Sequence, residues 1–586
     1  MTEAPDHATR SENVRRANGV LANTIAKTLW LAGCRRAVVA PGSRSTPLVL
    51  AFAACGFDLH VVHDERSGAF VALGTGRATE TPGVVITTSG TATANLFPAI
   101  VEAAADHVPL LVLTADRPLE LVGSGANQTI AQHGMYGTHV LRAYDLSSSS
   151  TIAERHIEAR IRDGYTIACS ERGPVHINVR FDKPLEIDVP ENAALSPGRE
   201  RDNTSIPRSS SSRAAQPNAL PSAVTDVDAV VVGRLATRRD IAAAHRIVRA
   251  LGVPTHASIT SGVRDAIEGD VPGTALLADI DSILEHERLA GALLGDRVLW
   301  LGGPVVSTRL GEYLVDAACT VCRIGSAVGD GNDAASEVVR LPLDSIADSI
   351  EVAAEGLSTN TPRRQEALVL ARAVGRALES LEPPLEARIA RSVAASTTDG
   401  GGFVLANSSP IRDVDRYVRA LPASRSYCNR GVSGIDGTLS TAYGIALTTE
   451  RAVTVLTGDL SFLYDSGSLS AMDASVRMRI VVIDNHGGGL FDRLPIAACD
   501  DHRDVFERCI VAPHRTDLVG VAVSHGFVAR RVETIEALEA ALRNDVRGIE
   551  VLVFPTDRAI ERSARARYRD AARTALASLE REHRGS

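Results

Sequence analysis

Cysteine is scarce in this chain, and its spacing is irregular. Eight cysteines in 586 residues are too few and too scattered for a disulfide framework, so reduced thiols are expected. The one pair with metal-ligand spacing, Cys319-Thr-Val-Cys322, has no second ligand pair and lies in an apolar, strand-like stretch. We therefore interpret Cys319 and Cys322 as ordinary buried residues rather than as a redox or zinc site.

Long hydrophobic runs are also missing. The N-terminus, MTEAPDHATRSENVRR, has no apolar run of signal-peptide length, and no stretch of about 18 uninterrupted apolar residues occurs in the chain. These absences predict that there is no integral membrane segment and that the protein stays in the cytoplasm.

An excess of positive charge is absent as well. The formal net charge is −9, which argues against a surface that neutralises a phosphate backbone and predicts no nucleic-acid partner. With 45% hydrophobic and 23% charged residues, the composition is that of a globular protein. A chain of this length exceeds one hydrophobic core, so about two to four domains are expected.

Short β-branched runs alternate with helical stretches in three segments. Residues 14–188 contain GVVITT and PLLVLTA, residues 226–350 contain DAVVVG and RVLWLG, and residues 364–575 contain AVTVLTGD and RIVVIDN. Residues 189–225 are rich in Ser, Pro, Asn and Arg, which predicts a flexible linker. The alternation predicts an α/β fold of three domains, each with a parallel sheet flanked by helices.

Several common catalytic motifs are absent. The chain has no GxxxxGK[ST], HExxH or GxSxG motif, so P-loop phosphoryl transfer and serine hydrolysis lose their usual support. Gly74-Thr-Gly76 resembles half of a dinucleotide fingerprint, but the third glycine is missing and a helical pattern, not a strand, precedes it. NAD binding is therefore not expected at Gly74 and Gly76.

The strongest chemical signal is a pair of polar residues that follow two strand-like runs. Asp459 comes after AVTVLTG, and Asn485 follows RIVVID twenty-six positions later. Ligand sites of parallel α/β sheets lie at strand carboxyl ends, and carboxylate, amide and backbone carbonyl oxygens suit a hard cation such as Mg²⁺. The spacing alone leaves a second interpretation open, in which Asp459 caps a helix and Asn485 sits in a glycine-rich turn.

This pattern resembles the GD…N motif of thiamine-diphosphate enzymes. In that family the Asp, the Asn and a backbone carbonyl two residues later bind the metal that holds the pyrophosphate of the cofactor. The resemblance implies thiamine diphosphate as cofactor, with Mg²⁺ or Mn²⁺ bound by Asp459, Asn485 and Gly487.

Glu65 stands in His63-Asp64-Glu65-Arg66, just after the second strand-like run, where thiamine-diphosphate enzymes carry their catalytic glutamate. In the family this glutamate hydrogen-bonds the aminopyrimidine ring of the cofactor and promotes its imino tautomer. The competing interpretation is a glutamate in the first turn of a helix, where the helix dipole favours it. Because the family assembles each site from two subunits, the resemblance implies a homodimer or homotetramer with sites at the subunit interface.

Five further motifs narrow the class: Ala40-Pro-Gly-Ser-Arg-Ser-Thr-Pro47, Thr88-Ser-Gly-Thr-Ala-Thr-Ala-Asn95, Thr114-Ala-Asp-Arg-Pro118, Gly125-Ala-Asn-Gln128 and Asn429-Arg-Gly-Val-Ser-Gly-Ile-Asp-Gly437. Together they resemble the 2-succinyl-5-enolpyruvyl-6-hydroxy-3-cyclohexene-1-carboxylate synthases of menaquinone biosynthesis. The resemblance implies decarboxylation of 2-oxoglutarate and addition of the succinyl-semialdehyde carbanion to isochorismate. The arginines suit this chemistry, because guanidinium groups bind carboxylates through paired hydrogen bonds.

By motif position, the resemblance assigns contacts to individual residues, although a surface arginine, a turn serine or a core isoleucine is the alternative for each one alone. The substrate-binding positions are Ser43, Arg44, Arg117, Asn127, Gln128, Ser408, Arg412 and Arg430, and the cofactor-binding positions are Glu65, Ile435, Asp459, Leu490 and Phe491. Where the family can carry a Lys-Arg pair, this chain has Ser307-Thr308-Arg309, so only Arg309 is assigned to substrate binding there.

Three other functions stay open at this point. Another thiamine-dependent 2-oxo acid decarboxylase, or an acetohydroxyacid synthase acting on pyruvate, is the nearest alternative, and the arginine-rich motifs argue against it. A non-catalytic scaffold is disfavoured because Glu65, Asp459 and Asn485 are all present. A flavin or nicotinamide redox protein would carry a coloured or fluorescent cofactor.

Overall fold

The computed structural model describes most of the chain, namely residues 7–149, 153–188, 222–264, 267, 273–317, 319–325, 336–356, 361–397, 400–421, 425–449 and 451–585. Most of the predicted linker, residues 189–225, lies outside the described residues. The described chain divides into two compact units. Unit 1 comprises Met1–Ala214, Asn429–Thr449 and Tyr464–Asp473, and unit 2 comprises Ala215–Cys428, Glu450–Leu463 and Ala474–Ser586.

The first sheet belongs to unit 1 and has six parallel strands in the order β2-β1-β3-β4-β6-β5. Their bounds are β1 Arg36–Val39, β2 Asp58–Val61, β3 Gly83–Thr87, β4 Leu110–Asp116, β5 Arg142–Ser147 and β6 Pro174–Arg180.

The second and third sheets belong to unit 2, and each also has six parallel strands. The second has the order β12-β11-β10-β7-β8-β9, with β7 Ala229–Val232, β8 Pro254–Ala257, β9 Ala275–Leu276, β10 Arg297–Leu301, β11 Thr320–Ile324 and β12 Glu337–Val339. The third has the order β14-β13-β15-β16-β18-β17, with β13 Gly402–Leu405, β14 Arg425–Tyr427, β15 Val453–Gly458, β16 Met478–Asp484, β17 Val528–Arg531 and β18 Ile549–Pro555.

The first and third sheets share one topology. When strands are counted from the first strand of each sheet, both have the order 2-1-3-4-6-5, whereas the second sheet has the order 6-5-4-1-2-3. The predicted α/β fold with three parallel sheets is confirmed. Each of the predicted segments 14–188, 226–350 and 364–575 contains one sheet, and their boundaries stay predictions.

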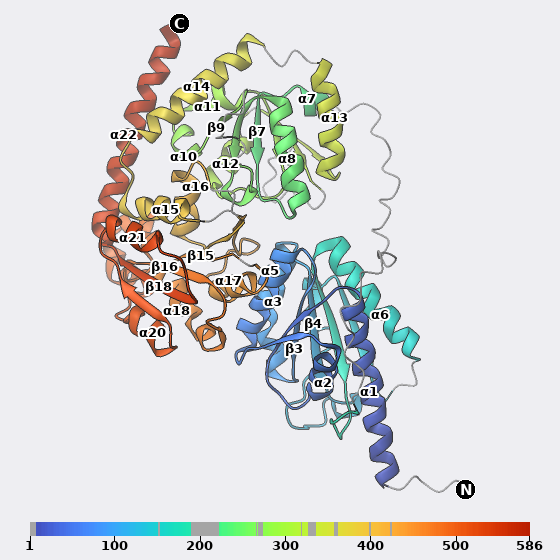
Figure 1. The fold of residues 1–586 in the computed structure, drawn as a ribbon. Helices are drawn as coiled ribbons and strands as arrows, with labels where there is room; N and C mark the ends of the chain where they lie inside the picture. The colour runs from blue at the N-terminus through green and yellow to red at the C-terminus, as the bar shows by residue number, and fades with distance from the viewer. Residues whose placement is uncertain are drawn as a thin grey trace. The chain divides into compact units, whose positions relative to one another are not determined.

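Helices flank the sheets (Figure 1). In unit 1, α1, α2 and α6 contribute to one buried core with the first sheet, while α3 packs on β3 and on α5. Both β3 and β4 are buried along their whole length, as expected for parallel strands covered on two faces. The helices of this unit are α1 His7–Leu31, α2 Thr46–Cys55, α3 Glu65–Thr79, α4 Thr91–Asn95, α5 Phe97–Ala105, α6 Glu154–Ile167 and α17 Thr438–Ala446.

The main helices of unit 2 cover the second and third sheets. They are α8 Arg238–Leu251, α11 Glu287–Leu294, α12 Thr308–Asp316, α13 Leu343–Gly356, α14 Pro362–Glu379, α15 Leu385–Ala395, α16 Ser409–Tyr417, α20 Leu518–Ser524, α21 Ile535–Leu542 and α22 Arg558–Gly585. The short α18, Asp459–Tyr464, follows β15 directly. In the part of the chain that the structure describes, no helix combines the length and the apolar character that crossing a bilayer requires.

Both cysteines of the CxxC pair lie in or beside a strand of the second sheet. Cys322 is buried within β11, and the half-buried Cys319 precedes that strand with its Sγ 3.9 Å from the Leu314 carbonyl oxygen. Burial raises the pKa of Cys322 to about 11, so its thiol is a poor source of thiolate. These surroundings agree with the interpretation as ordinary packing residues.

Helices α3 and α17 of unit 1 cross at glycines. A Cβ on Gly74 would lie within 3.0 Å of the Thr441 backbone, and a Cβ on Gly444 would lie within 3.0 Å of the Val71 carbonyl. Gly74 and Gly76, which the sequence compares with a dinucleotide fingerprint, are both buried inside α3. Their lack of a side chain therefore serves close backbone packing.

We expect Gly444→Ala to destabilise unit 1, because the added methyl group meets backbone that cannot rotate away. The expected loss is about 1–3 kcal/mol of unfolding free energy, measured by denaturant or thermal unfolding. Gly291→Ala is the matched control, since Gly291 lies inside α11 and a methyl group added there would have no neighbouring atom within 4 Å. That change should stabilise by about 0.5–1 kcal/mol through helix propensity. Equal effects of the two substitutions would contradict the close crossing.

Candidate active site

Asp459 joins the ends of two neighbouring strands in unit 2. Strands β15 and β16 pair in parallel up to Gly458 and Ile483, so the residues that follow them emerge at the same edge of the sheet. The Asp459 Oδ2 accepts hydrogen bonds from the backbone N–H of Asn485 (3.1 Å) and of Gly487 (2.9 Å), and its Oδ1 accepts one from Leu460 (2.6 Å). The two residues singled out by the sequence are thus brought together, and Asp459 also occupies the first turn of α18.

The donor set at this edge fits a hard cation. The Oδ1 of Asn485 is buried and has no hydrogen-bond partner, although its Nδ2 donates to Glu386 at 3.0 Å. Gly487 has φ +145°, and a Cβ there would lie 2.8 Å from the Val511 carbonyl oxygen, so a glycine is needed for this turn. An orphaned amide oxygen, a carboxylate and the Gly487 carbonyl are the kinds of ligand that Mg²⁺ takes.

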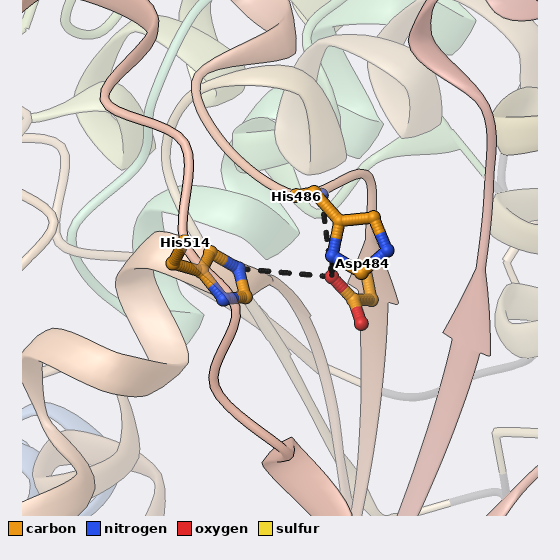
Figure 2. Close-up of side chains that lie close together, drawn as sticks. All are labelled: Asp484, His486 and His514. Atoms are coloured by element: carbon orange, nitrogen blue, oxygen red, sulfur yellow. Dashed lines mark hydrogen bonds and ion pairs between the residues drawn. The ribbon is translucent and has the colours of Figure 1, made fainter. Parts of the chain in front are cut away.

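Two histidines that the sequence did not single out lie beside Asp484, the last residue of β16 (Figure 2). The Nε2 of His514 lies 3.2 Å from Asp459 Oδ2 and 3.7 Å from Asp484 Oδ1, and the Nδ1 of His486 lies 3.3 Å from Asp484 Oδ1. Ligand-type atoms of Asp484, His486 and His514 all lie within 4.8 Å of one another. His514 stands twenty-nine positions after Asn485, so it is not part of the local motif that identified Asn485.

Burial dominates the electrostatics of Asp459. It raises the pKa of this carboxyl, while the hydrogen bonds from Gly487 and Leu460 and the proximity of His514 act in the opposite direction. A bound cation would add to these opposing contributions by favouring the ionised form.

Leu490 and Phe491 follow the glycine run in the short 3-10 helix Gly489–Arg493, and both are half-buried. Phe491 packs against a small apolar cluster of Ala497, Phe506 and Val511. This contact satisfies the packing alternative for Phe491, and a cofactor contact by either residue stays a prediction.

Asn485 and Arg412 line the same cavity in unit 2, which has a volume of about 410 Å³. Arg412 stands on the first turn of α16 and donates from NH1 to the carbonyl of Ser408 at 2.7 Å. Ser408 precedes the helix with φ +75°, an uncommon conformation for serine. Other residues that line the cavity include Glu386, Asp413, Arg493 and Arg565.

Arg309 has other partners. It stands on α12, where its guanidinium bonds Glu285 at 3.1 Å and the Asp281 carbonyl at 3.3 Å, and its side chain is half exposed. It does not line the 410 Å³ cavity, although Asp281 does. Its substrate contact stays a prediction.

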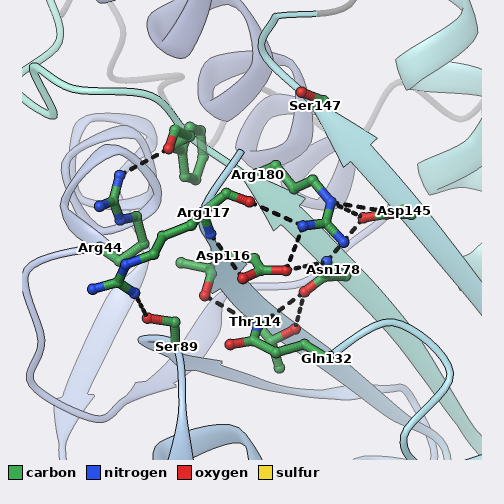
Figure 3. A network of polar contacts seen from close by, with 12 residues as sticks. Arg44, Ser89, Thr114, Asp116, Arg117, Gln132, Asp145, Ser147, Asn178 and Arg180 are labelled. Carbon is green, nitrogen blue, oxygen red and sulfur yellow. Dashed lines mark hydrogen bonds and ion pairs between the residues drawn. The ribbon is translucent and has the colours of Figure 1, made fainter. Parts of the chain in front are cut away.

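In unit 1, two arginines assigned to substrate binding converge at the carboxyl edge of the first sheet (Figure 3). Arg44 is buried and donates from NH1 to the Phe181 carbonyl at 2.9 Å. Arg117 follows β4 and donates from NH1 to the Ser89 hydroxyl and to the Gln128 carbonyl. Burial and the nearby Arg117 lower the pKa of Arg44. An anion bound between the two guanidinium groups would relieve that repulsion.

Gln128 belongs to the same group. Its Nε2 donates to the Ser89 carbonyl at 2.9 Å, and its backbone has φ +58°. Asn127 precedes it on the surface, and Ser43 precedes Arg44 in the exposed loop after β1. Arg117 and Gln128 are therefore joined by a direct hydrogen bond, and Arg117 is close enough to Arg44 to lower its pKa. Ser43, Asn127 and Gln128 are exposed.

A buried ion pair holds Arg117 in place (Figure 3). The Oδ1 of Asp116 accepts from the Arg117 backbone N–H at 2.7 Å, and its Oδ2 lies 2.9 Å from Arg180 NH1. Arg180 NH1 donates to the Arg117 carbonyl at 2.9 Å, and its Nε bonds Asp145. These partners are supplied by three different strands, so no sequence motif connected them.

Glu65 is the first residue of α3. The side chain of Asp64 caps this helix by accepting from Arg66 N at 3.0 Å and from the Ser67 hydroxyl at 2.8 Å. Glu65 itself is half-buried. This position satisfies the helix-dipole interpretation and leaves the carboxylate accessible for the role that the resemblance implies.

Arg430 and Ile435 lie on the loop that leads into α17, and Glu102 of α5 holds that loop. The Glu102 carboxylate accepts from the backbone N–H groups of Gly431 and Val432, both at 2.9 Å. Arg77 bridges Glu102 and Asp106. Burial raises the pKa of Glu102 to about 7, Asp106 adds to the increase, and Arg77 with the two N–H groups opposes it.

We expect Glu102 to make unfolding depend on pH. Since its pKa is raised in the folded state, its contribution is fully present below the ordinary value and is lost as pH rises through about 7. Glu102→Gln should therefore flatten the fall in melting temperature between about pH 5 and about pH 8, measured by calorimetry. Glu154→Gln, at the exposed start of α6, should keep the wild-type slope. An unchanged slope in the Glu102 variant would contradict the assignment.

Two family models match the chain, one in the segment of the first sheet and one in the segment of the third. Residues 20–135 match the family model of the thiamine pyrophosphate enzyme N-terminal TPP binding domain, and residues 411–553 match that of the C-terminal TPP binding domain. The first match contains Glu65, and the second contains Asp459 and Asn485. The chain is thus a thiamine pyrophosphate enzyme.

Relatives of similar length narrow the class. The 2-succinyl-5-enolpyruvyl-6-hydroxy-3-cyclohexene-1-carboxylate synthase of Myxococcus xanthus is 35% identical over 563 residues, covering 91% of this chain and 93% of the relative. Proteins of the same name from Halobacterium salinarum and Prosthecochloris aestuarii are also 35% identical, covering 94% and 83% of this chain and 98% and 85% of the relatives. The chain belongs to the 2-succinyl-5-enolpyruvyl-6-hydroxy-3-cyclohexene-1-carboxylate synthase family.

Proposed function

We propose that this enzyme joins 2-oxoglutarate, with loss of CO₂, to isochorismate and so forms 2-succinyl-5-enolpyruvyl-6-hydroxy-3-cyclohexene-1-carboxylate in menaquinone biosynthesis. The observation that carries the choice of substrates is the placement of Arg44 and Arg117 at one edge of the first sheet (Figure 3), because both substrates are dicarboxylates. Membership of the synthase family supports the same reaction.

The cofactor and metal are assigned to residues at the carboxyl edge of the third sheet. We propose that Asp459, Asn485 and the Gly487 carbonyl hold Mg²⁺ or Mn²⁺, with Asn485 using its unpartnered Oδ1. Ile435, Leu490 and Phe491 provide apolar contacts to the cofactor. Bound thiamine diphosphate supplies the carbanion chemistry that decarboxylation and carbon–carbon bond formation require.

The remaining residues bind, orient and move protons. Glu65 exchanges a proton with the aminopyrimidine ring. Substrate carboxylates are held by the guanidinium groups of Arg44, Arg117, Arg412 and Arg430, with Arg309 as a further candidate, and by the polar groups of Ser43, Asn127, Gln128 and Ser408. We propose a homodimer or homotetramer in which Glu65 comes from one subunit and the metal ligands from the other.

We expect repeated turnover, with CO₂ release and product formation, to require both substrates. Purified protein supplied with thiamine diphosphate and Mg²⁺ should consume 2-oxoglutarate and isochorismate in equal amounts. Chromatography measures the two substrates and the product, and a CO₂ assay measures decarboxylation. Pyruvate in place of 2-oxoglutarate should give little turnover, because it lacks the second carboxylate that an arginine can bind. Efficient turnover of pyruvate alone would instead identify a decarboxylase or an acetohydroxyacid synthase-like enzyme.

We expect Glu65→Gln to retain the fold and cofactor binding but to lower kcat by at least about 10²-fold, because a positioned proton-transfer group is lost. Calorimetric titration with thiamine diphosphate separates binding from turnover. Glu154→Gln, an exposed first-turn glutamate of α6, should remain fully active. A Glu65 variant that releases CO₂ from 2-oxoglutarate at the normal rate would exclude the catalytic role.

A further inference from the structure

Glu386 contacts the side chain that we assign to the metal. It lies in the first turn of α15, is 3% exposed, and its Oε1 accepts a hydrogen bond from Asn485 Nδ2 at 3.0 Å. The same oxygen accepts from the Thr556 hydroxyl at 3.2 Å. Thr556 directly follows β18, and its backbone N–H donates to the carbonyl of Asp484, the residue before Asn485. Glu386 therefore contacts Asn485, which follows β16 in the candidate metal site, and Thr556, which follows the neighbouring β18.

The bond to Glu386 decides which way the Asn485 amide points. An amide presents an oxygen on one side and an NH₂ group on the other, and only the oxygen binds a cation. With Nδ2 held by a carboxylate that accepts, Oδ1 is left on the opposite side, buried and without a partner. The reverse orientation would place the Asn485 oxygen against the Glu386 oxygen and aim the NH₂ group at the cation.

Glu386 is itself held by a cation from the C-terminal helix. The Arg565 NH2 group of α22 lies 2.9 Å from Glu386 Oε2. Arg565 also bonds Asp413 through both terminal nitrogens at 2.7 Å, and Asp413 follows Arg412 on α16. Burial alone would raise the pKa of Asp413, but Arg565 together with Arg493 and Arg416 outweighs burial, and the pKa is lowered. The same guanidinium thus fixes Glu386 behind the metal ligand and Asp413 beside a substrate-binding arginine.

We infer that Glu386 is a positioning residue that fixes the Asn485 amide with its oxygen toward the divalent cation. This inference rests on the metal role proposed for Asn485. Partners in the second layer around a metal orient the ligands, and their removal typically weakens metal binding by about 10–100-fold.

The test is Mn²⁺ binding to the full-length protein in the presence of thiamine diphosphate, measured from the electron paramagnetic resonance signal of free Mn²⁺. Glu386→Leu, which removes the acceptor, should weaken Mn²⁺ binding by about 10-fold or more. Thr556→Val removes the other hydrogen bond to Glu386 Oε1 and should leave Mn²⁺ binding unchanged.

Loss of folding is separated from loss of positioning by thermal unfolding of the metal-free variants. In Glu386→Leu the Arg565 guanidinium still pairs with the carboxylates of Asp413 and Glu561, so no unpaired buried charge is created. If Glu386→Leu does not fold, Glu386→Met, which keeps the length of the side chain without the oxygen, takes its place.

Asn485→Ala distinguishes the two proposals. If it does not weaken Mn²⁺ binding, the metal role of Asn485 is wrong, and the inference fails with it. If Asn485→Ala weakens binding while the Leu and Met variants of Glu386 do not, the positioning role alone is overturned.

Discussion

The carboxylate of Asp459 is the interaction on which the candidate metal site depends. By accepting the backbone N–H groups of Asn485 and Gly487, it fixes the loop after β16 against the end of β15. A parallel sheet brings these two strand ends to one edge, but only a buried acceptor between them sets the loop backbone. That backbone carries the Gly487 carbonyl and the Asn485 side chain. The positions of both therefore depend on the Asp459 carboxylate.

In unit 1, charged side chains fix the backbone of Arg117 in a similar way. The Asp116–Arg180 pair and Asp145 hold both the N–H and the carbonyl of Arg117, so the guanidinium group extends from a fixed backbone toward Arg44. Holding two like charges near each other where one of them is buried costs free energy, and a bound carboxylate would offset part of that cost. In both units, a charged side chain of the fold therefore organises the backbone of a residue assigned to binding.

The strands were predictable from the sequence because their signal is local. PLLVLTA became β4 and RIVVID became β16, and consecutive β/α units usually place such strands side by side. Asp459 and Asn485 could be selected for the same reason. Their supporting residues could not, since Glu386 stands 99 positions before Asn485 and Arg180 stands 63 positions after Arg117. Such contacts depend on how helices and strands pack against one another. Hydrophobic periodicity predicts the individual elements but not their packing.

The two compact units are interleaved along the chain, and this has a consequence for the order of synthesis. The partner of α3 at its Gly74 surface is α17, which belongs to a segment of unit 1 that begins only at Asn429. The last segment of that unit ends at Asp473. A ribosome must therefore translate all six strands of the second sheet, and β13 and β14 of the third, before α17 can pack on α3. An N-terminal fragment that ends before Asn429 therefore lacks the helix that packs on the Gly74 surface of α3.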